Sequence, residues 1–255
     1  MALLKVTNVS KVFGGLKAVS DFDVAIEKGE LVGLIGPNGA GKTTAFNLLT
    51  GVYEPTTGEI EFDGKSMIGL KPYQITQRGM ARTFQNIRLF AELSVLDNVK
   101  IAYHFHVKYG ILEAVFRMGR YHKEEAELEA KAIALLKIFK LDDKKDEIAK
   151  NLPYGEQRRL EIARALAAQP KLLLLDEPAA GMNPQETQEL MKMIKWIRQE
   201  FDLTILLIEH DMSLVMNVCE RIYVLEYGSI IAQGIPEEIK NNPRVIEAYL
   251  GEEVE

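Results

Sequence analysis

The chain has 255 residues and a formal charge of −6, with 47% apolar and 27% charged residues. This balance is typical of a globular protein and predicts one large domain, or one domain with an inserted subdomain. The acidic balance argues against a general nucleic-acid surface. Cys219 is the only cysteine, which excludes an intrachain disulfide framework and fits a reducing cytoplasm.

The first third of the chain alternates strand-like and helical patterns. Residues 4–9 and 18–26 alternate polar and apolar side chains and predict strands. Residues 31–35 are almost wholly apolar, as expected for a strand buried on both faces. A glycine-rich loop follows, and then a helix is predicted over 43–50 and a short hairpin around 59–62.

The middle of the chain changes character. Residues 94–150 predict helices, and 124–140 carry apolar residues at helical spacing. Strands are predicted again over 172–175, 204–208 and 221–225, with a helix over 185–200 and a helical end over 236–250. This order predicts an α/β sheet domain interrupted by a helical insert. No apolar run approaches the roughly 18 residues of a membrane span, so we expect any membrane part to be another chain.

The loop after residues 31–35 matches the pattern GxxxxGK[ST] between a strand and a helix. Its glycines allow backbone N–H groups to surround phosphate oxygens, and the helix dipole adds positive potential. We expect the lysine to reach the β- and γ-phosphates and the following threonine to ligate Mg²⁺. The predicted nucleotide-binding residues are Gly36, Pro37, Asn38, Gly39, Ala40, Gly41, Lys42, Thr43 and Thr44.

Two acids follow the apolar run 172–175. Ligands bind at the carboxyl ends of strands in open parallel sheets, so Asp176 is predicted to bind Mg²⁺ and Glu177 to polarise the attacking water. Together with the loop, this pair predicts a P-loop NTPase.

Residues 152–157 read Leu-Pro-Tyr-Gly-Glu-Gln, lead into a helix of the R-x-x-I-A-R-A-L type at 159–166, and precede Asp-Glu-Pro at 176–178. The order resembles the ATP-binding subunits of ABC transporters over essentially the whole chain. The resemblance implies an α/β fold, namely a P-loop NTPase core of the ABC ATPase type with an antiparallel β subdomain and an inserted helical subdomain. It also implies ATP and Mg²⁺ as cofactors. The expected catalytic core is 1–85 with 160–255, and the expected signature subdomain is 86–159.

Further residues are assigned from the resemblance. Phe13 looks like the aromatic that stacks on adenine, and Gln85 like the glutamine that contacts the metal or water and faces the membrane subunit. His210 matches the switch histidine that hydrogen-bonds the γ-phosphate, so the implied catalytic residues are Glu177, His210 and Lys42. Asn183 stands where the family usually has aspartate.

The signature departs from the family pattern LSGGQ. Tyr154, Gly155 and Glu156 are the expected contacts to the ATP of a second ATPase subunit, and Gly155 keeps the close backbone approach. Pro153 replaces serine and has no hydroxyl, so it cannot make the family's serine contact to the γ-phosphate.

Subfamily cues include residues 82–90, 154–164 and a tail at 241–251 that begins Asn-Asn-Pro. They resemble the ATP-binding subunit of branched-chain amino-acid importers. The alternatives are the ATPase of a lipopolysaccharide-type exporter, a soluble ABC ATPase outside transport and a metabolic P-loop kinase. The implied partners are integral-membrane permeases, a second ATPase subunit (self or paralogue) and, indirectly, a periplasmic or lipoprotein solute-binding protein, with no nucleic acid. The implied location is the cytoplasmic face of the cell membrane.

The segment 104–123 combines four basic residues with one acid and several aromatic residues. Val107, Ile111, Leu112, Val115 and Phe116 are spaced to form an apolar helical face. Two interpretations remain open: a basic surface near lipid headgroups or the membrane subunit, and an ordinary amphipathic helix of the helical subdomain. His104 and His106 are two residues apart and do not form a metal pair on a helix.

Overall fold

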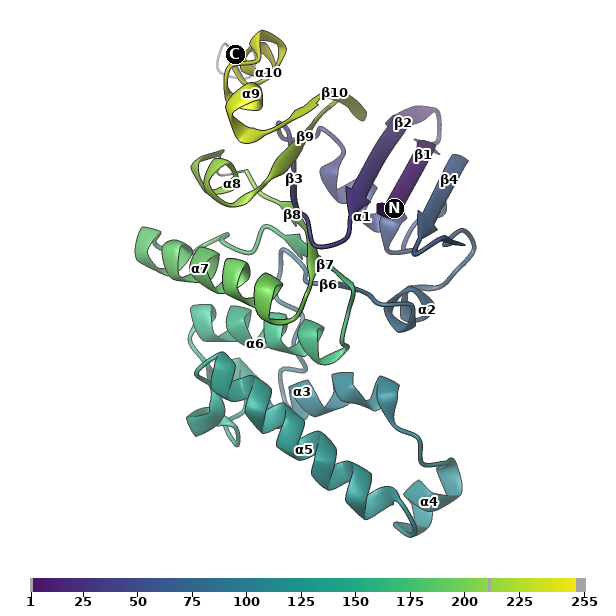
Figure 1. Ribbon diagram of the computed structural model, residues 1–255, viewed down its shortest axis with the longest axis vertical. Coiled ribbons are helices and arrows are strands. Elements are labelled where there is room, and N and C mark those ends of the chain that lie inside the picture. The colour runs from purple at the N-terminus through teal and green to yellow at the C-terminus, as the bar shows by residue number, and fades with distance from the viewer. Residues whose placement is uncertain (1, 211, 251–255) are drawn as a thin grey trace. The chain divides into compact units, whose positions relative to one another are not determined.

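The structure is a computed structural model that describes residues 2–210 and 212–250. The chain forms two compact units (Figure 1). The sheet unit contains the described residues up to Arg82 and from Lys171 onward, and the helical unit is Thr83–Pro170. No helix within these described residues is long and apolar enough to cross a membrane.

One sheet of the sheet unit is antiparallel. Its strands are β1 (Ala2–Phe13), β2 (Leu16–Glu27), β4 (Thr57–Phe62) and β5 (Lys65–Ser66), in the order β2-β1-β4-β5. The predicted strands at 4–9 and 18–26 are the central parts of a long hairpin, with Phe13 paired to Leu16 across its turn. The antiparallel β subdomain expected from the family resemblance is confirmed.

The second sheet has six strands in the order β10-β9-β3-β8-β7-β6. They are β3 (Leu31–Ile35), β6 (Met80–Arg82), β7 (Leu172–Asp176), β8 (Thr204–Ile208), β9 (Arg221–Glu226) and β10 (Ser229–Gly234). All neighbours are parallel except β9 and β10. Every residue of β3, β7 and β8 is buried, which explains why these runs are wholly or almost wholly apolar.

The helices of the sheet unit are α1 (Lys42–Leu49), α2 (Pro72–Gln77), α7 (Pro184–Glu200), α8 (Met212–Val218), α9 (Pro236–Lys240) and α10 (Pro243–Leu250). An apolar core joins side chains of both sheets and of α1, including Phe22, Phe46, Phe62 and Leu174. This core fixes α1, and with it the loop that precedes it, against the strands.

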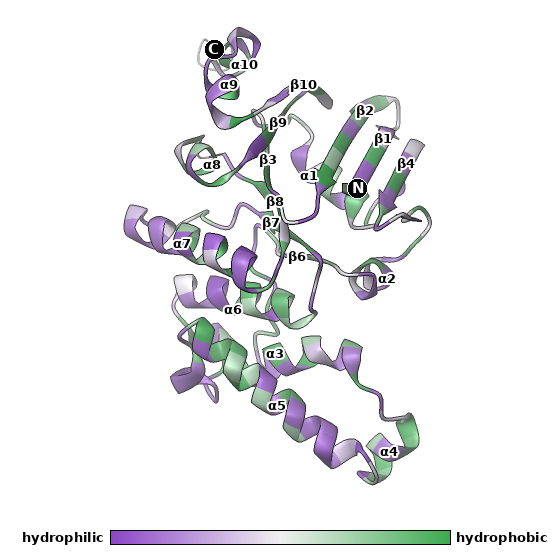
Figure 2. Cartoon of the chain, in the orientation of Figure 1, coloured by the Kyte–Doolittle hydropathy of each residue, from purple (hydrophilic) through white to green (hydrophobic). Residues whose placement is uncertain are grey.

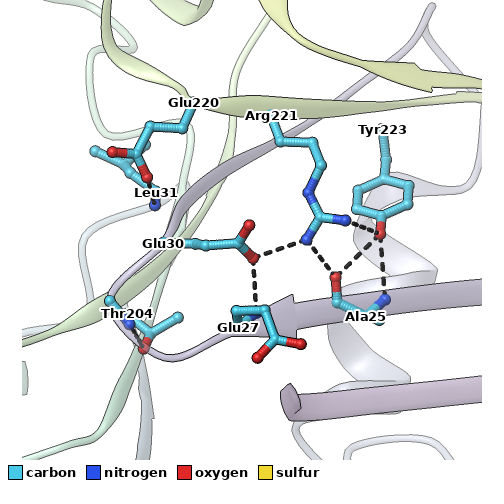
Figure 3. Close-up of polar contacts among 9 residues, drawn as sticks. Ala25, Glu27, Glu30, Leu31, Thr204, Glu220, Arg221 and Tyr223 are labelled. Carbon is cyan, nitrogen blue, oxygen red and sulfur yellow. Dashed lines mark hydrogen bonds and ion pairs between the residues drawn. The ribbon is translucent and has the colours of Figure 1, made fainter. Parts of the chain in front are cut away.

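A polar cluster also connects the two sheets (Figure 3). Arg221 on β9 donates to the Ala25 carbonyl on β2 (2.6 Å) and to Glu30 (2.7 Å). The Tyr223 hydroxyl bonds to both backbone groups of Ala25. These bonds hold the antiparallel sheet beside the turn that begins β3, the strand that leads into the glycine-rich loop.

The helical unit contains α3 (Val95–Tyr103), α4 (Ile111–Phe116), α5 (Tyr121–Ile138) and α6 (Tyr154–Ala167), with 3-10 turns at 104–106, 142–144 and 149–151. The apolar residues expected at helical spacing over 124–140 are all buried, four of them on α5 and one at its C-cap. They are Leu128, Ala132, Leu135, Leu136 and Phe139.

The segment 104–123 does not form the continuous apolar helical face that its spacing indicates. Val107 lies in an extended C-cap, outside α4. Arg117 ends α4 with φ 49° and Gly119 follows with φ 60°, so the chain turns sharply before α5 begins. Left-handed backbone at two nearby positions is incompatible with a helix, which explains the difference from the expected pattern.

Candidate nucleotide-binding site

The glycine-rich loop connects β3 to α1 and is pressed against neighbouring backbone. A Cβ atom on Gly36 would lie 2.0 Å from the Leu225 carbonyl oxygen, and one on Gly41 would lie 2.7 Å from the Ala18 carbonyl oxygen. Both glycines have positive φ, 151° and 101°. Only glycine fits both the space and the backbone conformation at these positions. The pattern seen in the sequence is therefore also a packing requirement of the loop.

Lys42 is the first residue of α1, and its side chain folds back over the loop. Its ammonium donates to the carbonyls of Gly36 (2.6 Å) and Pro37 (2.8 Å) and is buried. Gly41, at the N-cap, has no side chain, so the first N–H groups of α1 remain directed toward the loop. Thr43 is exposed and Thr44 half-buried in the same turn. The result is a fixed cation beside a helix N-terminus, an arrangement suited to phosphate.

Asp176 ends β7 and is held by a residue that the sequence reasoning did not single out. Arg82, at the end of the neighbouring β6, donates to its Oδ2 at 2.7 Å, and both side chains are almost fully buried. Arg82 also donates to Asn47 Oδ1 (2.7 Å) on α1 and to Oγ1 of its C-cap residue Thr50 (3.3 Å). This bridge ties the acidic strand end to the helix of the phosphate loop. The only feature of the sequence that could have indicated this role of Arg82 is its position directly before the Thr-Phe-Gln segment.

Glu177 and His210 lie together at the ends of β7 and β8. Glu177 Oε2 lies 3.7 Å from His210 Nδ1, and the His210 side chain is largely exposed. Glu177 has φ 45° while its N–H donates to the Ile208 carbonyl. A left-handed carboxylate residue at a strand end is a strained conformation of the kind that gathers at functional sites.

Glu209, between Ile208 and His210, supports the backbone near this pair. Its carboxylate accepts the Ala179 N–H at 2.9 Å, and burial raises the pKa of Glu209. It therefore fixes the backbone that follows Glu177 rather than facing solvent.

Phe13 sits at the exposed end of β1 and packs against a second aromatic ring. The Phe13 and Tyr53 ring centroids are 5.1 Å apart with the rings nearly perpendicular, and Phe13 keeps 40% of its surface exposed. Lys11 places its ammonium 5.1 Å from the Phe13 ring and donates to the Glu54 carbonyl. Tyr53 was not expected from the sequence, because a tyrosine in a loop carries no pattern.

In the helical unit, the Gln85 loop is fastened to α6. Arg158 donates to the carbonyls of Phe84 (2.6 Å) and Gln85 (2.7 Å) and pairs with Glu161 at 2.8 Å. Glu161 in turn accepts the N–H groups of Phe84 and Arg88. Arg158 and Glu161 are fully buried. Sequence reasoning missed both residues, although they lie within the quoted 154–164 segment.

The signature residues begin α6. Pro153 is its N-cap, and the Pro153 carbonyl accepts the N–H groups of Glu156 and Gln157. Tyr154 is exposed at its ring, while its hydroxyl accepts from Arg158 at 3.2 Å. Glu156 is held by two contacts from Lys144, at 2.7 and 2.8 Å, and this bond raises the pKa of Lys144. Glu156 is therefore an ion-paired side chain in this chain.

Asn183 caps α7. Its Oδ1 accepts from the N–H groups of Gln185 and Glu186, each at 3.0 Å, and the Glu186 carboxylate returns a bond to the Asn183 N–H. Asparagine caps helices as well as aspartate does, which gives a structural reason for the substitution at this position.

The fold thus gathers some of the predicted site residues and separates others. The loop 36–44, Asp176, Glu177 and His210 all lie at the carboxyl ends of adjacent strands β3, β8 and β7. Gln85 and the signature residues belong to the other compact unit. Within the described residues, no group of three or more His, Cys, Asp or Glu is placed to hold a metal by itself.

Comparison with known proteins identifies the family. The profile described as ABC transporter matches residues 19–180, and the profile described as branched-chain amino acid ATP-binding cassette transporter matches residues 229–255. The chain is 48% identical, over 98% of both chains, to the high-affinity branched-chain amino acid transport ATP-binding protein LivG of Salmonella typhimurium. It is 36% identical, over 99% of both chains, to the lipopolysaccharide export system ATP-binding protein LptB of Haemophilus influenzae.

Solved structures of ATP-binding cassettes have a similar fold. The ADP conformation of an ATP-binding cassette of an ABC transporter superposes with TM-score 0.85 at 32% identity, covering 98% of this chain and 99% of that one. A dimeric post-hydrolysis cassette bound to ADP and Pi has TM-score 0.77 at 26% identity, with 91% and 98% covered. On the sequence motifs, the strand order and these similarities, the chain belongs to the ABC transporter family as one of its ATP-binding ATPases.

Proposed function

We propose that this chain is the ATP-hydrolysing motor subunit of an importer for branched-chain amino acids. The observation that carries the solute class is the match of residues 229–255 to the branched-chain profile. That segment lies outside the ABC transporter match at 19–180, so it separates this subfamily from ABC ATPases in general. The near full-length similarity to LivG supports the same solute class.

Nucleotide binding is assigned to the sheet unit. The backbone N–H groups of the loop 36–44, in which Pro37 has none, surround the phosphates, and the Lys42 ammonium exchanges its bonds to the loop carbonyls for bonds to phosphate oxygens. The exposed Phe13 ring, braced by Tyr53, stacks on adenine. The structural support is that the cation and the aromatic pair are already held in place by the fold.

The implied metal ion fits the donor set. Thr43, Asp176 and Gln85 offer only hydroxyl, carboxylate and amide oxygens, which suit Mg²⁺. When bound, Mg²⁺ neutralises charge on the phosphate oxygens. Arg82 holds Asp176 in position for this role through its bond to Oδ2.

Glu177 is assigned as the general base. Its carboxylate accepts a proton from the attacking water, and His210, 3.7 Å away, contacts the γ-phosphate and orients the carboxylate. The bond from Glu177 N–H to the Ile208 carbonyl fixes the strained backbone of this residue. Catalysis in this class rests on positioning and charge stabilisation more than on covalent chemistry.

The signature residues are assigned to the ATP of a second ATPase subunit, either a copy of this chain or a paralogue. Tyr154, Gly155 and Glu156 stand at the N-terminus of α6, where N–H groups favour a phosphate. We assign the catalytic core to the sheet unit and the signature to the helical unit. Permease subunits, a solute-binding protein and the cytoplasmic face of the membrane complete the proposed assembly. Closure of the ATPase pair would drive the permeases between access states.

The second candidate is the ATPase of a lipopolysaccharide-type exporter, favoured by the similarity to LptB. Identity to that protein is lower, 36% against 48%. A test in cells separates the two. A chromosomal Lys42→Ala substitution should abolish uptake of labelled leucine while leaving lipopolysaccharide at the cell surface unchanged. Normal leucine uptake in that strain would refute the importer assignment.

Purified protein tests the catalytic assignments. Glu177→Gln should retain ATP binding and lose at least about a hundredfold in hydrolysis, since the general base is removed. This variant should also sediment as a dimer with Mg·ATP and as a monomer without nucleotide. Near wild-type hydrolysis would remove Glu177 from the general-base role. Absence of a dimer, both alone and with the paralogous ATPase, would refute the split site.

A further inference from the structure

The short helix α4 exposes its apolar side chains instead of burying them. Ile111, Leu112, Val115, Phe116 and Met118, here named the α4 patch, each keep between 62% and 83% of their surface exposed. Figure 2 colours most of α4 as hydrophobic, and in Figure 1 it lies beside the N-terminal end of α5. Single exposed apolar residues are common, but five within eight positions form a contiguous patch that marks an interaction site.

The α4 patch is held in a defined shape by polar bonds on its inner side. Glu113 accepts the N–H groups of Gly110 and Arg120. Glu124, at the start of α5, accepts the N–H groups of Lys108 and Tyr109. The polar groups therefore make the internal contacts, and the apolar groups face outward. This is the reverse of the pattern by which an amphipathic helix joins a protein core.

Exposed basic residues flank the patch. They are Lys108, Arg117, Arg120 and Lys123, whereas the nearby acids Glu124 and Glu125 are half-buried in contacts with the segment 104–109. Glu113 is the one acid between residues 104 and 123, and its carboxylate contacts Arg120 and inner N–H groups. Lys123 keeps most of its side chain exposed and pairs only loosely, at 4.0 Å, with the exposed Glu127.

We propose that the α4 patch docks onto the anionic headgroup surface of a lipid bilayer. Apolar side chains beside lysine and arginine are the two elements of an interfacial helix, in which the former enter the headgroup boundary and the latter bind anionic lipid. A protein partner would account for the exposed apolar residues but not for the basic residues around them. The positive charge of those basic residues is complementary to phosphate headgroups. This surface lies outside every residue assigned to nucleotide binding or hydrolysis.

Flotation of the purified full chain with vesicles tests the proposal. We expect binding to vesicles of phosphatidylcholine mixed with phosphatidylglycerol, weak binding to phosphatidylcholine alone, and loss of binding as salt rises. Leu112→Asn with Phe116→Asn should weaken binding at least about tenfold, because both side chains leave the headgroup boundary. Arg117→Glu with Lys123→Glu should weaken it by a similar factor through charge. The matched control is Leu16→Asn, since Leu16 on β2 is 71% exposed and Leu112 73%.

A site-specific probe identifies which surface meets the lipid. Burial raises the pKa of the Cys219 thiol to about 12, so this cysteine reacts slowly with thiol labels in the folded protein. Val115→Cys and, as control, Leu16→Cys therefore accept an environment-sensitive fluorophore selectively. The label at position 115 should shift to shorter wavelength with anionic vesicles, and the label at 16 should not.

Three results would overturn the proposal. One is absence of binding of the wild-type chain to anionic vesicles. Another is undiminished binding of the Leu112 and Phe116 double variant. The third is binding only to detergent-solubilised permease, which would assign the α4 patch to a protein surface. ATPase activity of the α4 variants should stay at the wild-type level. A failure of the lipid-docking proposal would therefore leave the assignment of the chain as an ATPase motor intact.

Discussion

Replacing Arg158 by methionine should destabilise the helical unit and impair hydrolysis together. Arg158 is fully buried, pairs with Glu161 and donates to the carbonyls of Phe84 and Gln85. Methionine fills similar volume but provides no charge and no donor. The substitution leaves the Glu161 carboxylate buried without its counter-ion and removes the bonds from Arg158 to the Phe84 and Gln85 carbonyls, so that only Glu161 still ties this loop to α6.

The expected loss is about 3–5 kcal/mol, the range for breaking one half of a buried ion pair. For a chain of this size, that corresponds to a fall in Tm of roughly 6–20 °C. Glu161→Leu alone should cost a similar amount, because Arg158 is then the unpaired charge. The double variant Arg158→Met with Glu161→Leu should recover part of the loss, since a pair of well-packed apolar side chains replaces two buried charges.

The stability loss of Arg158→Met should depend on pH in a defined direction. Burial raises the pKa of Glu161, while the Arg158 charge and the N–H groups of Arg88 and Phe84 oppose the rise. In Arg158→Met the Arg158 charge is gone and only the weaker effect of the Arg164 charge remains, so the pKa of Glu161 rises further. An acid whose folded pKa lies above its unfolded value contributes less stability as pH rises between the two. The variant should therefore be more destabilised, relative to wild type, at about pH 8 than at about pH 5.

Thermal unfolding followed by circular dichroism measures all four proteins of the double-mutant cycle, and ATPase rates are measured on the same samples. Arg159→Met is the matched control, because Arg159 lies on the same helix, is partly exposed and reaches Glu156 only at 3.7 Å. It should cost less than about 1 kcal/mol. A coupling energy near zero between positions 158 and 161, or a Tm change no larger than that of the control, would refute this reasoning.

Three further predictions concern the sheet unit. Arg82→Met should lower both Tm and ATPase activity, because it leaves the buried carboxylate at the end of β7 without its 2.7 Å partner; a variant with unchanged hydrolysis would mean that this bridge does not position the site. Gly36→Ala should abolish ATP binding by nucleotide titration, whereas Gly39→Ala, where an added Cβ meets nothing within 4 Å, should be milder; equal affinities would contradict the packing argument. Asn183→Ala should cost about 1 kcal/mol by loss of the α7 cap and Asn183→Asp almost nothing, as measured by urea unfolding, and equal losses for the two would exclude capping.

Local patterns in the chain were sufficient to place the glycine-rich loop and the two acids at the ends of their strands. A strand buried on both faces, a glycine-rich loop and a helix are neighbours in sequence, so Gly36 to Thr43 could be recognised without tertiary information. The same holds for Asp176 and Glu177 after their apolar strand. The α5 core positions followed from helical spacing, because burial along one helix repeats with its turn.

Tertiary structure alone decided which residues hold these groups in place. Arg82 meets Asp176 across 94 positions of sequence, and Arg158 meets Phe84 across 74. Neither contact produces a periodic pattern in the sequence, because an arginine in a polar stretch is normally interpreted as a solvent-exposed residue. Pairing between distant segments depends on strand order and helix packing, which no local pattern encodes.

The segment 104–123 also shows which properties follow from the sequence and which from the tertiary structure. Its composition identified basic and apolar residues near one another, but left open whether they form a core-facing helix or a surface. The backbone settles this, because the left-handed residues Arg117 and Gly119 turn the chain and place the apolar side chains outward. Sequence determined the chemistry of this protein's groups, and the fold determined their neighbours, because contact is a property of three-dimensional packing and not of order along the chain.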